Sequence, residues 1–526
     1  MRRSALGVAV WTLLSRVTGM ARVLVAGGVL GPTYTANIFQ ASNTLPNNVY
    51  TVFAGPIVAM VVVPSVVHAS TGAGAGPGQA REVLGRVAGR LLTVAGLATV
   101  GLVLLSPALA WSLVLGVPGP DRSRAWLLAL VLIVCVAPQV VLYTAISLAQ
   151  AAQQSRDRFA LAAGASTLEN LATIAVVAAA GTMFGSGLDV AHTQLAMVIW
   201  LGAGSTVAVL IHAGLQFYGA ARVGLLVIPR WGLARSEEAQ RCVRRIARSM
   251  SVPAKSAATS YLVAAIAASV PGGVTVIQFA SQVSNGVSFI AARAVSMAAM
   301  PRLATAAAAG DLPGFAAAWR KCLHYATLAA LPPLCLLMLF APTVADLVSQ
   351  GELADRVLVT ELGACLAIAA VGQMVSGIHD LGRRALFARL DDRGPRRASL
   401  VAFFVSVLVA GLAALLHPDP TTTLITLMMA MVVGEAAGAV MVLLGVRRHI
   451  RPERLAEAGT GAHALLATLA MLPALAAGFL LIRHVGSGRL VDLAVLAGTT
   501  AVAIALFLWC SVALGRRQTP LHEDRL

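Results

Sequence analysis

Runs of about twenty apolar residues follow one another along almost the whole chain of 526 residues, and only short loops separate them. A helix of that length spans the hydrocarbon core of a bilayer, where backbone polar groups must be bonded within the protein. Hydrophobic residues make up 58% of the sequence, charged residues 12%, and the mean hydropathy is +0.82. These values exclude a soluble globular protein and leave no room for a large extramembrane domain. We therefore predict an all-α polytopic membrane protein.

Breaks at proline, glycine and charged residues divide the apolar runs into about fourteen predicted helices. Their ranges are 5–30, 35–68, 90–117, 125–151, 159–184, 191–220, 249–270, 274–300, 322–349, 359–382, 398–416, 421–446, 461–483 and 490–514. Alternate loops are rich in arginine, as at Arg81, Arg222 and Arg244, whereas the loops between them hold few, such as Arg122 and Arg124. The positive-inside rule then predicts that both termini face the cytoplasm.

A strongly basic segment at residues 222–248 lies near the middle of the chain, between the sixth and seventh predicted helices. We predict an N-terminal bundle at 1–221, a basic cytoplasmic linker at 222–248, a second bundle at 249–447, and a C-terminal helix pair with a cytoplasmic tail at 448–526. Paired bundles are common in transporters, which place the substrate site between them. The prediction is therefore two bundles around a central cationic cavity.

Ionisable residues inside the predicted helices are the candidate functional residues, because a membrane bundle keeps them only against a partner or a wet cavity. Arg16 and Arg22 lie in the middle of the first helix, where each guanidinium costs about 2.5–3.5 kcal/mol on insertion. They point about 240° apart around an ideal helix, so a narrow shared site requires a bend at Gly19. In the second helix, Pro46 frees a backbone carbonyl beside Asn47, which favours a broken polar segment lining a cavity.

Further polar residues follow in the seventh and eighth predicted helices. Gln282 and Arg293 are eleven residues apart, about three turns, so we expect them on one face at different depths. Lys255 and Arg293 lie toward the predicted cytoplasmic ends, where snorkelling to the interface is an alternative to a binding role. Other intramembrane carboxylates are alternative structural partners for the arginines: Glu169, Glu361 and Glu435, with Asp380 a further ionisable candidate. A cationic cavity suits an anionic solute such as a pyrophosphate or carboxylate.

The sequence lacks the signatures of enzymes, metal sites and nucleotide binding. It contains no HExxH, GxSxG or Walker motif, and no nucleophile beside a base. Its six cysteines form no CxxC and lie mostly in apolar runs, which favours packing over metal binding or disulfides. The formal net charge of +17 is spread among loops instead of forming one basic face, which argues against nucleic-acid binding. We expect no enzyme activity, cofactor or metal ion, and a first helix that is retained instead of cleaved.

Four stretches of the sequence resemble the MurJ/MviN family of lipid II flippases. They are "SRVTGMAR", "TANIFQASNTLPNNVYTVFAGPIVAMVVVPSV", "PGGVTVIQFASQVSNGVSFIAARAVSMAAMPRLA" and "GRRALFARLDDRGP", spread over nearly the whole chain. The resemblance implies a V-shaped pair of bundles in the multidrug/oligosaccharidyl-lipid/polysaccharide exporter superfamily, in the bacterial plasma membrane. The implied activity is transport of lipid II, the undecaprenyl-pyrophosphate-linked peptidoglycan precursor, to the outer leaflet by alternating access. This activity serves cell-wall synthesis and cell shape.

The resemblance also assigns roles to residues. It places Arg16 and Arg22 on two essential cavity arginines of the family, and Pro46 and Asn47 on its LPN motif. A third essential arginine, in the eighth helix, is replaced here by Gln282.

The sequence differs from the family pattern at three further positions. It has Ala36 in place of an aspartate, Tyr50 in place of an arginine and Gly55 in place of a glutamate. Lys255 and Arg293 are the candidates to restore the lost positive charge. The eleventh helix lacks the Asp and Asn of sodium-coupled relatives, which leaves membrane potential or protons as the energy source.

Three alternatives to lipid II transport stay open, and the departures motivate the first and the third. The first is a flippase for another lipid-linked saccharide, and the second is a drug or organic-ion antiporter of the same superfamily. The third is a non-transporting scaffold that recruits cell-wall synthesis or division proteins through basic cytoplasmic loops. An exporter of cations requires carboxylates in its cavity, and the intramembrane carboxylates are too scattered to favour it.

Overall fold

A computed structural model of the chain describes residues 2–55, 58, 62–67, 77–231, 237–416, 419–457, 459–485 and 488–518. Within these ranges all regular structure is helical and no strand is present, which confirms the predicted all-α class. Eleven of the described helices are long and apolar enough to cross a membrane, or twelve if one bent pair is a single span. The count of fourteen stays a prediction. The predicted second helix, the linker at 222–248 and the C-terminal tail lie partly outside the described residues.

The chain packs as two compact units. Unit 1 is Met1–Phe279 with Gly351–Leu353, and unit 2 is Ala280–Gln350 with Ala354–Leu526. The change from one unit to the other therefore falls inside a helix, α11 (Gly273–Ile290). The domain limits predicted around the basic segment 222–248 divide the chain by the order of its membrane spans. They stay a prediction.

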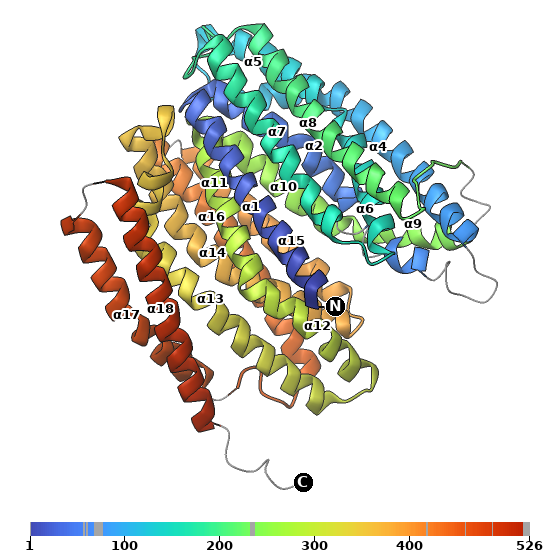
Figure 1. The fold of residues 1–526 in the computed structure, drawn as a ribbon, viewed down its shortest axis with the longest axis vertical. Coiled ribbons are helices and arrows are strands. Elements are labelled where there is room, and N and C mark those ends of the chain that lie inside the picture. The colour runs from blue at the N-terminus through green and yellow to red at the C-terminus, as the bar shows by residue number, and fades with distance from the viewer. Residues whose placement is uncertain are drawn as a thin grey trace. The chain divides into compact units, whose positions relative to one another are not determined.

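Unit 1 is a bundle in which α1 packs against α7, α7 against α8, and α8 against α5 and α6 (Figure 1). Glycines allow close helix contact, as expected in a membrane bundle. A Cβ atom on Gly164 would lie 2.8 Å from the Trp11 ring, and one on Gly202 would lie 2.6 Å from Cβ of Cys135. Besides the first part of α11, the helices are α1 (Arg2–Leu30), α2 (Tyr34–Phe53), α4 (Pro77–Leu113), α5 (Gly119–Val136), α6 (Gln139–Gln154), α7 (Ala160–Phe184), α8 (Leu195–Arg222), α9 (Glu237–Ser249) and α10 (Ser251–Ala267).

One buried side chain on α2 fixes the turn between α10 and α11. The Asn37 amide donates to the carbonyls of Val270 at 2.6 Å and Ala268 at 3.2 Å, and its oxygen accepts from the Val274 N–H at 3.0 Å. The Ala268 carbonyl follows the end of α10 and the Val274 N–H lies in the first turn of α11, where backbone groups lack partners inside their own helices. Asn37 therefore satisfies both ends of the turn at once.

A segment of turn and irregular structure at residues 223–231 lies across α4. The Arg230 N–H donates to the Gly85 carbonyl at 2.8 Å. A Cβ atom on Gly89 would lie 2.3 Å from the Arg230 oxygen, and one on Gly85 would lie 2.7 Å from the Ile228 oxygen. Two glycines one turn apart on α4 thus form the groove that this segment occupies.

A short segment far along the chain, residues 351–353 of the 3-10 helix η2 (Gly351–Ala354), completes unit 1. Leu353 is buried against α1, where a Cβ atom on Gly27 would lie 2.6 Å from its Cδ1 atom. Glu352 lies against Gly31 and Gly187. The absence of side chains on these glycines leaves the space that residues 351–353 fill.

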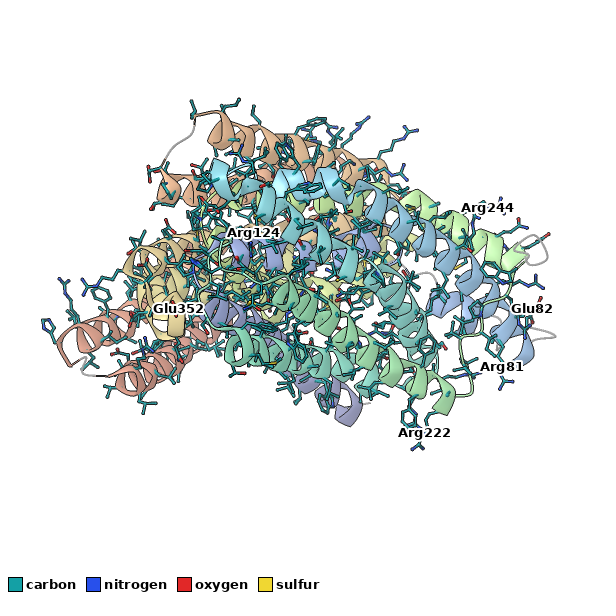
Figure 2. The ribbon with its side chains drawn as sticks, turned by 90° about the horizontal axis from the view of Figure 1, so that it is seen from above. Arg81, Glu82, Arg124, Arg222, Arg244 and Glu352 are labelled. Atoms are coloured by element: carbon teal, nitrogen blue, oxygen red, sulfur yellow. The ribbon has the colours of Figure 1, made fainter. Side chains whose placement is uncertain are left out.

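Labelled charged side chains lie at both ends of unit 1 (Figure 2). Arg81, Arg222 and Arg244 lie at one end together with Glu82, whereas Arg124 lies toward the other end. The Arg124 guanidinium donates to the carbonyls of Val190 and Thr193 at 2.9 Å each. The orientation of the termini that the arginine pattern predicts stays a prediction.

Unit 2 has a core of large side chains from α13, α14 and α16. Phe315 and Trp319 are fully buried there with Leu386, and the Trp319 indole donates to the Leu455 carbonyl at 2.9 Å. α17 and α18 form a pair that packs against α13 (Figure 1). Besides the rest of α11, the helices are α12 (Ala292–Ala308), α13 (Leu312–Val348), α14 (Arg356–Ala388), α15 (Arg393–Leu416), α16 (Pro420–Ile450), α17 (Thr460–Val485) and α18 (Arg489–Gln518).

Candidate functional site

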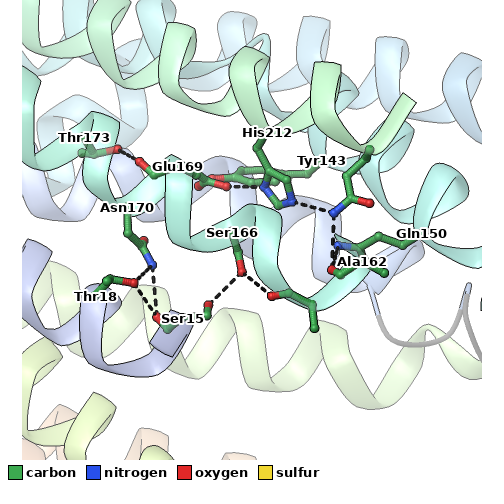
Figure 3. A network of polar contacts seen from close by, with 12 residues as sticks. Ser15, Thr18, Tyr143, Gln150, Ala162, Ser166, Glu169, Asn170, Thr173 and His212 are labelled. Atoms are coloured by element: carbon green, nitrogen blue, oxygen red, sulfur yellow. Dashed lines mark hydrogen bonds and ion pairs between the residues drawn. The ribbon is translucent and has the colours of Figure 1, made fainter. Parts of the chain in front are cut away.

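A buried carboxylate, Glu169 of α7, is the centre of a polar network in unit 1 (Figure 3). Its Oε1 atom accepts from the Tyr143 hydroxyl of α6 at 2.9 Å, and its Oε2 atom lies 2.6 Å from Nδ1 of His212 on α8. Glu169 and His212 are only 7% and 4% exposed. A carboxylate at this depth is tolerated only with such partners, because its desolvation costs several kcal/mol.

The network continues from His212 through two glutamines. Nε2 of Gln216 lies 3.2 Å from Nε2 of His212, and Oε1 of Gln216 accepts from the Gln153 amide at 2.6 Å. Since its oxygen is already an acceptor, Gln216 presents its NH2 group to the imidazole. Nε2 of His212 is then the acceptor, and Nδ1 carries the proton that points at Glu169.

Another face of α7 packs against α1 (Figure 3). The Asn170 amide donates to the Ser15 carbonyl at 3.1 Å and to the Thr18 hydroxyl at 3.2 Å. The hydroxyls of Ser15 and Ser166 lie 2.8 Å apart (Figure 3). The helix that carries Arg16 and Arg22 is therefore fixed by residues next to Glu169 in the sequence.

The site residues predicted on α1 and α2 all lie in unit 1. Arg22 is half-buried and interacts electrostatically with Glu169 and Tyr143. Arg16 is exposed on the same helix, which continues without interruption through Gly19. Pro46 is buried inside α2 and Asn47, the next residue, is exposed. Lys255 is half-buried on α10, also in unit 1.

Gln282 and Arg293 lie in unit 2, on two different helices. Both are half-buried, Gln282 on α11 and Arg293 on α12, and the chain bends by 42° between these helices. The register of one ideal helix therefore does not relate the two side chains, because the predicted eighth helix is broken. The Arg293 guanidinium donates to the Ser376 hydroxyl of α14 at 2.9 Å, while its buried Nε atom has no hydrogen-bond partner among the described residues.

The other intramembrane carboxylates have different kinds of partner. Glu435 lies 2.9 Å from Nδ1 of His379 and interacts electrostatically with Arg293. Glu361 accepts from the Thr421 hydroxyl at 2.9 Å. Asp380 forms ion pairs with Arg383 and Arg384, at 3.0 Å and 2.8 Å, and accepts from Ser296. Asp380 therefore has a structural role at the end of α14.

Unit 2 also contains a large, mostly apolar groove of about 1490 Å³. Its walls come from α13 and α18, with side chains such as Leu328, Leu336, Ile504 and Phe507. One end is polar and is formed by Arg320, Lys321, His324, Tyr325, Glu457 and His463. The groove thus suits a long hydrocarbon chain with a polar group at one end.

Sequence reasoning missed the two histidines that bind intramembrane carboxylates, His212 and His379. Both are formally neutral, so a search for charged residues in apolar helices passes over them. A signal was present, because buried histidine in a membrane helix is rare and needs a polar partner. Among the described residues no three His, Cys, Asp or Glu side chains gather as a metal site.

Residues 27–495 match the family model for the lipid II flippase MurJ. The chain belongs to the MurJ lipid II flippase family. A probable lipid II flippase MurJ of Haemophilus influenzae is 26% identical to it over 226 residues, which are 42% of each chain. The alignment with this relative thus spans less than half of either protein. The MurJ family is one of lipid transporters, not of catalytic enzymes.

Solved structures share the fold over most of the chain. A structure of the lipid II flippase MurJ in an inward closed conformation has a TM-score of 0.72 at 14% identity, covering 97% of this chain and 99% of that one. An inward-facing multidrug resistance MATE family transporter of the MOP superfamily has a TM-score of 0.60 at 15% identity, covering 84% and 94%. An outward-facing one has a TM-score of 0.55 at 14% identity, covering 85% and 95%. The fold is therefore that of MurJ and its MOP superfamily neighbours.

Proposed function

We propose that this protein flips lipid II from the inner to the outer leaflet of the bacterial plasma membrane by alternating access. The observation that carries the proposal is the match of residues 27–495 to the MurJ family. The fold similarity to MATE transporters in inward-facing and outward-facing states supports alternating access, because the same architecture occurs in both. The arginine distribution supports a topology with both termini in the cytoplasm and the basic segment 222–248 as a cytoplasmic linker.

The described side chains fit a lipid that carries a pyrophosphate. Arg16 and Arg22 present two guanidinium groups on one helix, and a guanidinium binds phosphate oxygens through several N–H donors. The apolar groove of unit 2 suits an isoprenoid chain. We propose that Arg16 and Arg22 bind the pyrophosphate, with Asn47, Lys255, Gln282 and Arg293 as further substrate contacts.

A flipping assay with the purified protein in liposomes tests this function. Fluorescent lipid II is placed in one leaflet, and its appearance in the other is measured for the wild type, Arg16→Ala and Arg22→Ala. We expect transport to fall at least tenfold in either variant, with unchanged yield and melting temperature. Arg222→Ala is the matched control, because Arg222 is exposed and contacts the Tyr218 hydroxyl at the end of α8. Wild-type rates in both arginine variants would refute the assigned pyrophosphate contacts.

One observation favours a second candidate function, transport of a different lipid-linked saccharide. Gln282, a neutral amide, is half-buried on α11 where the family resemblance expects an arginine. Native mass spectrometry with lipid II, undecaprenyl phosphate and an unrelated polyprenyl-linked saccharide separates the two candidates. Selective retention of lipid II supports the first, and preference for the other saccharide supports the second. Binding of none of the three, with protein partners retained in an Arg16→Ala, Arg22→Ala double variant, would indicate a scaffold for cell-wall enzymes.

A further inference from the structure

The Glu169 and His212 pair has the chemistry of a proton-binding site inside unit 1. The hydrogen bonds described above keep the imidazole neutral and leave the negative charge on the carboxylate. The pair therefore carries a net charge of about −1 and has room for one proton, which would make it neutral. Both side chains are more than nine-tenths buried, so the added proton changes a charge that water screens poorly.

The groups near this pair come from α1, α2 and α6. The Tyr143 hydroxyl of α6 donates to Glu169, and so does the Nδ1–H group of His212 on α8. On α1, Arg22 interacts electrostatically with Glu169 and Tyr143, and on α2 the Tyr50 ring packs 5.6 Å from the Tyr143 ring. Arg22 is the cation among these groups that compensates the charge of the pair.

Arg22 therefore interacts with two anions, the carboxylate of Glu169 and any anionic group that binds from outside. It is half-buried, so part of the side chain remains accessible to a ligand. When an anionic group engages the guanidinium, Glu169 loses part of its electrostatic compensation, and the neutral, protonated form of the pair becomes favoured. The reverse holds by linkage, since protonation of the pair releases Arg22 for the external anion.

We propose that Glu169 and His212 form a proton-binding site that takes up one proton when an anionic pyrophosphate headgroup binds at Arg22. This inference rests on the proposed function for the identity of the anion. The incoming proton comes from water and binds within the pair, and it is released to water when the anion leaves. Asn170, next to Glu169, holds α1 through Ser15 and Thr18, so a change of charge at the pair occurs beside the contacts that position Arg22.

Proton uptake on ligand binding is the direct test. Purified protein in detergent and weak buffer is titrated with lipid II while a pH-sensitive dye records protons taken up. Affinity for lipid II is measured in parallel between pH 5.5 and 8.5, for the wild type and Glu169→Gln. We expect uptake approaching one proton per bound lipid in the wild type, with affinity rising by up to about tenfold per unit fall in pH. Glu169→Gln imitates the protonated pair, so it should take up no proton and keep high affinity at pH 8.5.

At pH 8.5 the Glu169→Gln variant should therefore bind lipid II more tightly than the wild type. This result separates proton linkage from a purely structural role of Glu169, because lost packing would weaken binding at every pH. Glu82→Gln is the matched control, since Glu82 pairs with Arg86 at the surface of α4 and should retain the wild-type profile. Where Glu169→Gln does not fold, the measurement on the wild type still tests the proposal, because it compares protons taken up with lipid bound in the same protein. Uptake that persists in Glu169→Gln, or wild-type binding without proton uptake, would overturn the proposal. Inorganic pyrophosphate serves as a second probe: Glu169-dependent uptake with pyrophosphate but no binding of lipid II would refute the proposed function and keep the linkage.

Discussion

Replacement of Asn37 by alanine tests whether one buried amide holds the turn between α10 and α11. Asn37 is 1% exposed and makes three hydrogen bonds to backbone groups of Ala268, Val270 and Val274, which are also buried. The substitution leaves the Ala268 carbonyl and the Val274 N–H without the partner that Asn37 supplies, whereas the Val270 carbonyl still accepts from the Gly273 N–H at 2.9 Å. A buried polar group without a partner costs about 1–3 kcal/mol. Partial relaxation of the turn reduces the sum, so we expect a loss of about 2–5 kcal/mol in the free energy of unfolding.

The measurement is reversible unfolding in mixed micelles, followed by circular dichroism, for Asn37→Ala and for Asn48→Ala. Asn48 is a half-buried asparagine on the same helix, so it controls for loss of an amide from α2. The reasoning is refuted if Asn37→Ala costs less than about 1 kcal/mol, the net value of a single hydrogen bond, or no more than Asn48→Ala.

Three further predictions concern loops and packing. Burial raises the pKa of Asp391, but hydrogen bonds from the Gly394 N–H and from His449 outweigh it and lower that pKa overall. Asp391 therefore stabilises the fold above its unfolded pKa of about 3.9, and this stabilisation is lost as the pH falls through the lower folded pKa. Asp391→Asn should lower the melting temperature at pH 7, and in strong acid the variant and the wild type should melt at the same temperature. Leu390 is 91% exposed and has a φ of +58°, so Leu390→Gly should raise stability by about 0.5–1 kcal/mol, and a lower melting temperature would contradict this. Gly89→Val should displace residues 223–231 from α4 and make that segment sensitive to protease, whereas unchanged digestion would show that the glycine is not needed.

The helices were predictable because the bilayer requires long apolar segments, and hydropathy is read directly from the sequence. The partners of the polar residues were not. Glu169 was recognised as an intramembrane carboxylate, yet its contact with His212 depends on how α7 and α8 pack, since the residues are 43 positions apart. The break between α11 and α12 also escaped prediction, because the apolar run continues through Ala291. Arg16 and Arg22 were found from their charge alone, and their roles stay predictions.

The segment 351–353 has a consequence for how the protein is made. It fills the space beside Gly27 and Gly31, but it is synthesised only after α12 and α13. At about 5–20 residues per second, the roughly 70 residues after Phe279 take about 4–14 s to make. During that interval the N-terminal bundle exists without its last piece, so it reaches its final packing only when part of the second half has entered the membrane. If the chain were divided at residue 279 and its two parts were produced as separate polypeptides, the second would have to supply residues 351–353 to the bundle of the first.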